Sequence, residues 1–174
     1  MFLLRDEILQ EHSKAQTQKI ADWVGKDEQR FKELLRLFLH DEYRVVQRAA
    51  WIVSKVAEQH QELVEPYLEE IVARMTDENV HVAVRRNATR ILQFVTIPES
   101  LHGDVMNTCF RFFENPAETI AVRCFSMTVL SNLAKYYPEI KQEIKLVIED
   151  TLENGASAGF KSRAKKTLSD LDIH

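Results

Sequence analysis

Residues that interrupt helices are scarce in this sequence, which has four glycines and four prolines among 174 residues. Runs of alternating β-branched and polar residues, which mark half-buried strands, are absent as well. Both absences favour an all-helical fold. Apolar residues make up 45% of the chain and charged residues 29%, which is an ordinary composition for one folded domain.

Long hydrophobic segments are also missing. No apolar run reaches the length of about 18 residues that a membrane-spanning helix needs. The first residues, Met1-Phe2-Leu3-Leu4, lack the basic region and the long apolar region of a signal peptide. We therefore expect a cytoplasmic protein that has no membrane partner.

Motifs of catalysis and of metal or phosphate binding are missing too. The sequence has no HExxH, no Gly-rich phosphate loop and no G-x-S-x-G, and its six histidines lack the spacing of a zinc site. The two cysteines, Cys109 and Cys124, form neither a CxxC pair nor part of a His-rich cluster, so we predict that both are partly buried small side chains. We expect no enzyme active site, no metal and no cofactor.

What the sequence does contain is a pattern that returns every 38 residues, beginning in the stretch 45–53. Its five columns hold apolar or small residues almost throughout. The columns are Val46, Val84, Val122 and Phe160; Ala50, Ala88, Ser126 and Ala164; Val53, Ile91, Val129 and Thr167; Ser54, Leu92, Leu130 and Leu168; and Ala57, Val95, Leu133 and Leu171. Their offsets place them on one face of a helix. A period between about 20 and 50 residues is typical of a solenoid.

Each repeat is predicted to be two antiparallel helices joined by a tight polar turn. The predicted hairpins span residues 27–60, 61–97, 98–137 and 138–171 within a single domain, 1–174. Asp27 is a candidate N-cap for the first hairpin. Pro98 and Pro138 stand at the beginnings of the third and fourth hairpins, and Pro66 suits the first turn of the first helix of the second hairpin, where the missing N–H of proline is tolerated.

The N-terminal residues 1–26 match the repeat columns poorly. Residues 5–24 place Ile8, His12, Ile20 and Trp23 near one helical face, and Gly25 suits a C-cap. We expect one capping helix here that buries Trp23 against the first hairpin, because the end of a solenoid must be covered. His12 is predicted to be a hydrogen-bonded interior histidine.

A turn acid followed by Val-Arg-x-x-Ala resembles the HEAT repeat, a relative of the armadillo repeat. The copies are Asp77 with Val84-Arg85-Arg86-Asn87-Ala88, Asn115 with Val122-Arg123-Cys124-Phe125-Ser126, and Asp41 with Val46-Gln47-Arg48-Ala49-Ala50. The resemblance covers residues 27–171 and implies an all-α, right-handed α-α superhelix of about four hairpins. It also implies that Arg85, Arg123 and Lys161 are structural, as members of a polar ladder between repeats.

The face of each second helix that lies opposite to the buried columns is predicted to be exposed, at about 100° per residue. The predicted positions are Arg44, Arg48, Trp51 and Lys55 in the first hairpin, Arg86, Thr89, Arg90 and Gln93 in the second, Cys124, Met127 and Ser131 in the third, and Ser162, Lys165, Lys166 and Ser169 in the fourth. In a curved helical solenoid the second helices line the concave wall, which is the usual binding surface.

The predicted concave wall carries a net positive charge. The second helices, at 43–59, 80–95, 118–136 and 159–171, carry net charges of +2, +3, +1 and +3, whereas the whole chain carries −4. A basic concavity concentrates anionic partners, and an exposed Trp51 among cations suits a peptide anchor or a stacked base. The predicted binding patch is Arg44, Arg48, Trp51, Lys55, Arg86, Arg90, Lys165 and Lys166. The alternative is that these charges are a solvated surface and that Trp51 packs against the neighbouring repeat.

Two functions fit this patch. The first is a non-enzymatic scaffold that holds an acidic protein segment in the basic groove. The second is nucleic-acid binding, because the DNA alkylation repair glycosylases have a HEAT-like fold and a basic, aromatic-containing concave surface. That resemblance is architectural: those enzymes are longer and rely on an Asp beside Trp and Arg, whereas the exposed positions predicted here include no acid. The sequence leaves the partner's identity and the oligomeric state open.

Overall fold

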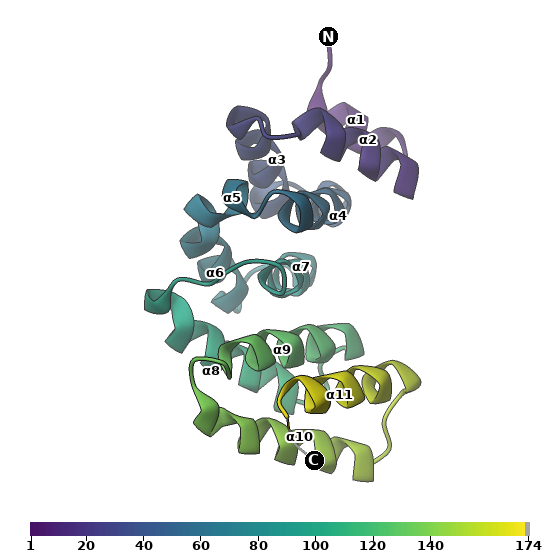
Figure 1. The fold of residues 1–174 in the computed structure, drawn as a ribbon. Helices are drawn as coiled ribbons and strands as arrows, with labels where there is room; N and C mark the ends of the chain where they lie inside the picture. Colours follow the sequence, from purple (N-terminus) through teal and green to yellow (C-terminus); the bar gives the residue numbers. More distant parts are fainter. Residues whose placement is uncertain (173–174) are drawn as a thin grey trace. The chain divides into compact units, whose positions relative to one another are not determined.

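A computed structural model describes residues 1–172 of the chain (Figure 1). The helices form two compact units, Met1–Pro98 and the residues from Glu99 onward. The boundary lies at Pro98, where the sequence predicts that the third hairpin begins.

The first unit contains three helical hairpins. They are α1 (Leu4–Gln10) with α2 (Lys14–Val24), α3 (Glu28–His40) with α4 (Tyr43–Gln59), and α6 (Leu68–Thr76) with α7 (Val82–Leu92). Two short helical turns, α5 (Gln61–Val64) and η1 (Glu65–Tyr67), lead into α6. The second helices of these hairpins pack side by side, with α4 against both α2 and α7 (Figure 1).

The second unit contains two hairpins, α8 (His102–Glu114) with α9 (Ile120–Leu133) and α10 (Lys141–Glu153) with α11 (Ala158–Asp170). The turns η2 (Glu99–Leu101) and η3 (Pro138–Ile140) lead into α8 and α10. Helices α9 and α11 pack on each other, as the second helices of the first unit do. Since residues 1–172 form helices and no strand, the fold is the all-α helical repeat solenoid that the sequence predicts.

Side-chain caps set the starts of several helices. The Asp27 carboxylate accepts a hydrogen bond of 3.0 Å from the backbone N–H of Arg30, as predicted. Ser13, Thr119 and Ser157 cap α2, α9 and α11 in the same way. Gly25 ends α2 with a φ of +51°, in the left-handed region that a residue with a side chain rarely adopts.

The repeat columns form the core. Every column residue is buried except Val95 and Leu168, which are partly exposed. Val95 falls outside its helix because α7 ends at Leu92, and Leu168 lies on the last helix, α11. Both cysteines are buried free thiols, and burial raises the pKa of Cys109 to about 12.

The N-terminal segment is not one capping helix. Glu11 is extended, and the Ser13 hydroxyl accepts from the N–H of Gln16 to begin α2, so the segment is a hairpin of its own. The sequence Ser13-Lys14-Ala15-Gln16 carries the spacing of a capping box, which is the local signal for this break. The break leaves His12 exposed rather than interior. Trp23 is only half-buried and stacks on Phe2, with ring centroids 4.3 Å apart.

A polar contact joins this hairpin to the next one. The Arg5 guanidinium on α1 donates to both carboxylate oxygens of Asp41, in the turn between α3 and α4, at 3.1 Å. Hydrogen bonding from Arg5 lowers the pKa of Asp41, against a smaller opposing effect of burial.

Two kinds of site are absent from the described part of the chain. None of its helices has the length and apolar character that crossing a membrane requires. Within residues 1–172, no group of three or more His, Cys, Asp or Glu side chains could hold a metal ion.

Substitution Ala88→Leu is expected to lower the free energy of unfolding by about 1–3 kcal/mol, because the added methyl groups would overpack a fully buried column. Ala73→Leu is the matched control, since Ala73 is exposed on α6. Urea unfolding followed by circular dichroism measures both. Equal stability of the two variants would contradict the packing of this column.

Substitution Arg5→Ala should raise the pKa of Asp41 toward its ordinary value of about 3.9. In the parent, the lowered folded-state pKa means that Asp41 stabilises the fold above its unfolded-state pKa. This contribution disappears as pH falls through the folded-state value. Arg5→Ala should therefore lose less stability than the parent between neutral pH and about pH 3. Urea unfolding at both pH values tests this, with the exposed Lys32→Ala as a control; an unchanged pH dependence in Arg5→Ala would refute it.

Candidate functional site

A groove in the first unit runs between two ridges of side chains on α4 and α7. Residues four positions apart on a helix lie next to one another on its surface, so each set forms a ridge. The ridge of α4 is Tyr43, Gln47, Trp51 and Lys55, and the ridge of α7 is Val82, Arg86 and Arg90. Two pockets of about 360 and 320 Å³ lie along the groove. We call the whole surface, including the start of α2 at one side, the α4–α7 groove.

Trp51 and Arg90 line both pockets. The Arg90 guanidinium lies over the indole ring, with its central carbon 4.0 Å from the ring centroid. A cation at this position is attracted by the π face. Trp51 is still 46% exposed, and His12 approaches it at a steep angle, with ring centroids 6.5 Å apart. The pair therefore leaves part of a large aromatic surface open to a partner.

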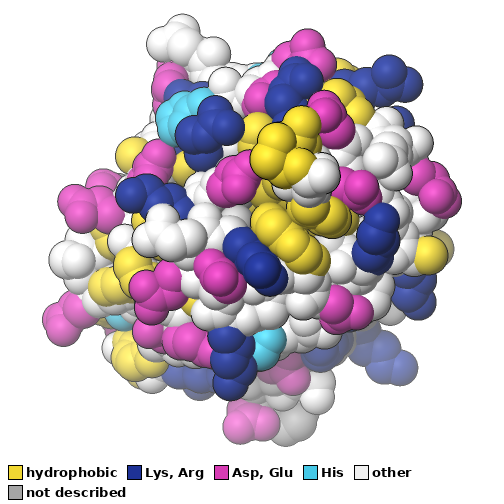
Figure 2. Space-filling view, turned by 90° about the horizontal axis from the view of Figure 1, so that it is seen from above, with side chains coloured by type: hydrophobic (Ala, Val, Ile, Leu, Met, Phe, Trp, Pro, Cys, Tyr) yellow, Lys and Arg dark blue, Asp and Glu magenta, His cyan; other side chains and the backbone are white. Residues whose placement is uncertain are grey.

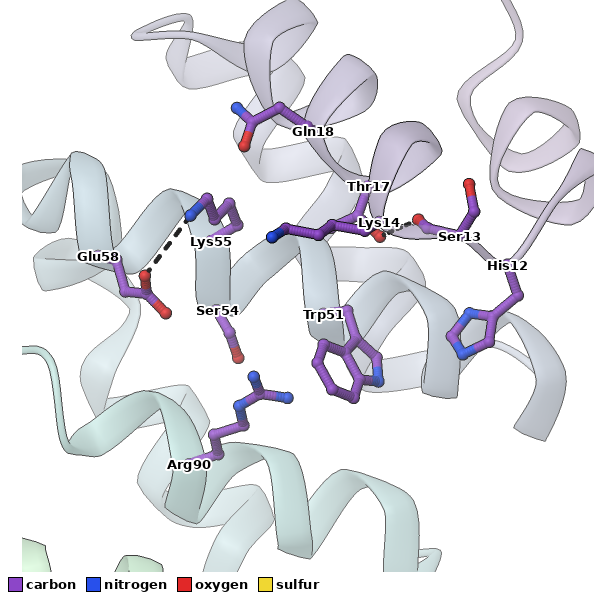
Figure 3. Close-up of a pocket in the computed structure, with 10 residues that line it drawn as sticks. All are labelled: His12, Ser13, Lys14, Thr17, Gln18, Trp51, Ser54, Lys55, Glu58 and Arg90. Carbon is purple, nitrogen blue, oxygen red and sulfur yellow. Dashed lines mark hydrogen bonds and ion pairs between the residues drawn. The ribbon is translucent and has the colours of Figure 1, made fainter.

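The larger pocket, which we call the α2 pocket, lies between α2, α4 and α7 and is cationic. It is lined by His12, Ser13, Lys14, Thr17, Gln18, Trp51, Ser54, Lys55, Glu58 and Arg90. Figure 3 shows Lys14 extending from α2 toward the space next to Trp51, whereas the ammonium group of Lys55 on α4 is turned toward Glu58. Glu58 is the one acid of this lining, and its carboxylate lies 3.8 Å from the Lys55 ammonium.

The smaller pocket, which we call the Tyr43 pocket, is more aromatic. The rings of Tyr43 and His81 lie side by side, with centroids 4.4 Å apart. Tyr43 and Val82 are exposed at this end of the groove, and the Gln47 amide donates to the Tyr43 hydroxyl at 2.8 Å. Arg86 is the cation of this pocket besides Arg90. The groove thus has a cationic end and an aromatic end.

Arg90 is half-buried and forms no ion pair with the residues that the structure describes. Among the described residues, its guanidinium makes neither an ion pair nor a hydrogen bond, and its contact is the face of Trp51. Burial lowers the pKa of Arg90, against the opposing charge of Glu58, and the charge of Arg86 lowers it further. An arginine stays protonated in spite of such a shift. A half-buried cation of this kind would gain from an anion that supplied the missing partner.

Ser54 lines the α2 pocket with an unpartnered hydroxyl. The residue is 1% exposed, and its oxygen is buried without a hydrogen-bond partner. The other members of its repeat column are leucines, so this hairpin has a small polar side chain where the others have a large apolar one. Because serine is smaller than leucine, this position leaves room beside Trp51 and Arg90.

The structure brings four of the predicted patch residues together in the groove, namely Trp51, Lys55, Arg86 and Arg90. Arg44 is exposed near the start of α4 but lines neither pocket. Lys165 and Lys166 are exposed on α11 in the second unit, and their membership of the same patch stays a prediction.

Arg48 does not point freely outward as predicted. It is half-buried, and its Nη1 donates to the carbonyl oxygens of Ile8 and Leu9 at 3.2 and 2.9 Å. These carbonyls belong to the last turn of α1, where a helix leaves acceptors without partners. Arg48 therefore fastens α1 to α4 and positions the turn that carries His12.

Four other positions predicted to be exposed are buried: Thr89, Cys124, Met127 and Ser131. The second helices touch neighbours on their flanks, with α7 against α4 and α9 against α11. A projection of one helix has no information about such neighbours, so it overestimates the exposed arc. It also missed His12, Lys14, Ser54 and Glu58, and of these only Ser54 carried a signal, as the exception in a leucine column.

Comparison with protein families is consistent with this geometry. A family model of the HEAT repeat domain matches residues 4–171. The chain belongs to the HEAT repeat family. No curated protein matches it in sequence. HEAT repeat domains commonly mediate protein interactions and are typically non-catalytic scaffolds.

The HEAT repeat match begins at residue 4 and so includes the α1–α2 hairpin. Arg123 has the structural role that the resemblance implied: it is buried, and it donates to the Phe113 carbonyl and the Thr151 hydroxyl, both at 2.9 Å. These partners are not turn acids, however, and the turn acid Asp41 pairs with Arg5 instead. Lys161 is exposed.

Substitution Arg48→Ala is expected to lower the free energy of unfolding by about 1–3 kcal/mol, because two carbonyls lose a charged donor. Arg44→Ala, an exposed arginine of the same helix, should change it by less than about 0.5 kcal/mol. Urea unfolding compares the two variants. If both behave alike, Arg48 does not fasten α1.

Proposed function

We propose that this HEAT repeat protein is a non-enzymatic interaction module that binds an acidic segment of a partner protein in the α4–α7 groove. The observation that carries the proposal is the pair of Trp51 and Arg90, an exposed indole beneath a half-buried guanidinium that forms no ion pair within residues 1–172. Aromatic and arginine side chains of this kind dominate binding energy at protein interfaces. The cytoplasmic location remains a prediction from the sequence.

The dimensions of the groove suit a short extended segment. The α4 ridge runs from Tyr43 to Lys55, which is about 18 Å at a rise of about 1.5 Å per residue. About five or six extended residues cover that length at about 3.3 Å each. An acidic residue of the partner would lie in the α2 pocket, and an apolar residue would lie against Tyr43 and Val82.

The distribution of charge favours a protein over a nucleic acid. A nucleic-acid backbone is neutralised by cations repeated along its length, whereas the cations here are concentrated beside Arg90 and the other end of the groove is aromatic. On the face seen in Figure 2, Lys and Arg side chains are intermixed with Asp and Glu. The chain as a whole carries −4. The DNA alkylation repair glycosylases rely on an Asp beside Trp and Arg, and Glu58 is an acid in the same pocket as Trp51 and Arg90. The Glu58 carboxylate, however, lies next to the Lys55 ammonium.

The test is a titration with fluorescein-labelled six-residue peptides that differ only in three positions, occupied by Glu, Gln or Lys. The Glu peptide should bind most tightly, and the triple variant Trp51→Ala, Arg86→Ala, Arg90→Ala should weaken it at least about tenfold. The double variant Lys32→Ala, Arg36→Ala removes two exposed cations of α3 that line neither pocket, and it should bind like the parent. Fluorescence anisotropy measures all of these affinities.

Two outcomes would contradict the proposal. Equal binding by the parent and the triple variant would exclude the groove. Tighter binding of a DNA oligonucleotide, with an affinity that falls steeply between two salt concentrations, would favour the nucleic-acid alternative. Lys165→Ala with Lys166→Ala tests separately whether the cations of α11 contribute.

A further inference from the structure

The α2 pocket collects cations from three different helices. Lys14 lies at the start of α2, Lys55 in the last part of α4 and Arg90 near the end of α7 (Figure 3). Glu58 offsets one of these charges through its contact with Lys55. The lining therefore carries an excess of two positive charges. A phosphate monoester carries about −1.5 to −2 at neutral pH, whereas a carboxylate carries a single charge.

The pocket also has donors that the protein itself leaves unused. The Arg90 guanidinium makes no hydrogen bond within the described residues. The Ser54 hydroxyl is buried and has no partner, which destabilises the free protein. A phosphoryl group presents three strong acceptor oxygens, and a guanidinium can bind two of them side by side. Arg90, Lys14 and Ser54 thus supply donors of the number and charge that such a group accepts.

The α2 pocket has room for a ligand next to Ser54, the one residue of its repeat column that is not a leucine. Ser54 occupies the place of Leu92, Leu130 and Leu168, and it borders a pocket of about 360 Å³. This space admits a phosphoryl group as well as a carboxylate, so the charge and the number of donors are what distinguish the two ligands. In Figure 3 the Ser54 hydroxyl is directed toward Arg90, so a leucine at this position would extend toward that side chain.

We propose that the α2 pocket binds a phosphorylated serine or threonine side chain of the partner, with Arg90, Lys14 and Ser54 as the groups that contact the phosphoryl oxygens. This inference rests on the proposed function and names the anchor residue of the bound segment. Trp51 packs against the methylene or methyl group next to the phosphate and holds Arg90 in place through its ring face.

The test uses Trp51 as its own reporter. The chain has two tryptophans, and Trp23→Phe leaves Trp51 as the single one while keeping an aromatic ring stacked on Phe2. The probes are four: a six-residue peptide with a central phosphoserine, the same peptide with Ser, the same peptide with Glu, and inorganic phosphate. The phosphoserine peptide should change Trp51 fluorescence saturably and bind at least about tenfold more tightly than the Glu peptide.

Variants assign the effect to the pocket. Arg90→Ala should weaken phosphoserine binding at least about tenfold, and Arg90→Lys should restore part of it. Ser54→Ala should be at least as stable to urea as the parent, because it removes an unpartnered buried hydroxyl, and yet bind the phosphoserine peptide more weakly. Ser54→Leu should abolish binding by filling the pocket. Ser131→Ala is the matched control, since Ser131 is a buried serine of α9 in the second unit.

The outcomes separate this inference from the proposed function. Tight binding of the Glu peptide, with no preference for phosphoserine, would overturn the phosphate assignment and leave the acidic-segment proposal standing. Failure of both acidic peptides to bind would overturn both. Unchanged phosphoserine binding by Arg90→Ala and Ser54→Leu would place the site elsewhere, and inorganic phosphate or a DNA oligonucleotide that bound as tightly as the phosphopeptide would exclude a protein partner as the source of the phosphate.

Discussion

Helix α4 packs against α3 along one side and against α2 and α7 along its flanks, so only a narrow strip of its surface stays exposed. Tyr43, Gln47 and Trp51 lie on that strip because they follow one another at four-residue spacing. The small and apolar columns allow the flanking helices to approach closely, and the same approach places Arg90 of α7 over the Trp51 ring. The groove is thus a consequence of how tightly the second helices pack.

Polar contacts attach the first hairpin to the second, whereas the apolar columns hold the other hairpins together within each unit. The α1–α2 hairpin matches the columns poorly, and it is tied to the next hairpin by Arg5 with Asp41 and by Arg48 with the last carbonyls of α1. These contacts hold the turn at His12 and the start of α2 beside Trp51, so Lys14 lines the same pocket as Arg90. Arg48, which the sequence predicted to be part of the binding patch, instead fastens α1 to α4 beside the groove.

The groove combines features that lower stability with features that favour a ligand. Within the described part of the chain, the half-buried Arg90 forms no ion pair and the buried Ser54 hydroxyl has no hydrogen-bond partner. Each is unfavourable in the free protein, because desolvated polar groups lose their hydrogen bonds to water. An anionic side chain of a partner would satisfy both at once. The HEAT repeat scaffold supplies the rigid helices on which these groups can be held in place without collapse.

The repeat period, the helical hairpins, the caps at Asp27 and Gly25 and the buried columns were determined by the sequence alone, because periodicity and capping are properties of short stretches of chain. The cationic character of the second helices was evident there as well, whereas the sequence left open whether Trp51 is exposed or packs against the neighbouring repeat. Only the tertiary structure decided that Arg48 is fastened to Ile8 and Leu9, that Thr89 and Met127 are covered, and that Arg90 lies over the Trp51 ring. Each of these depends on which atoms of another helix, distant in sequence, fill the space around the side chain, and a single helical projection contains no such atoms.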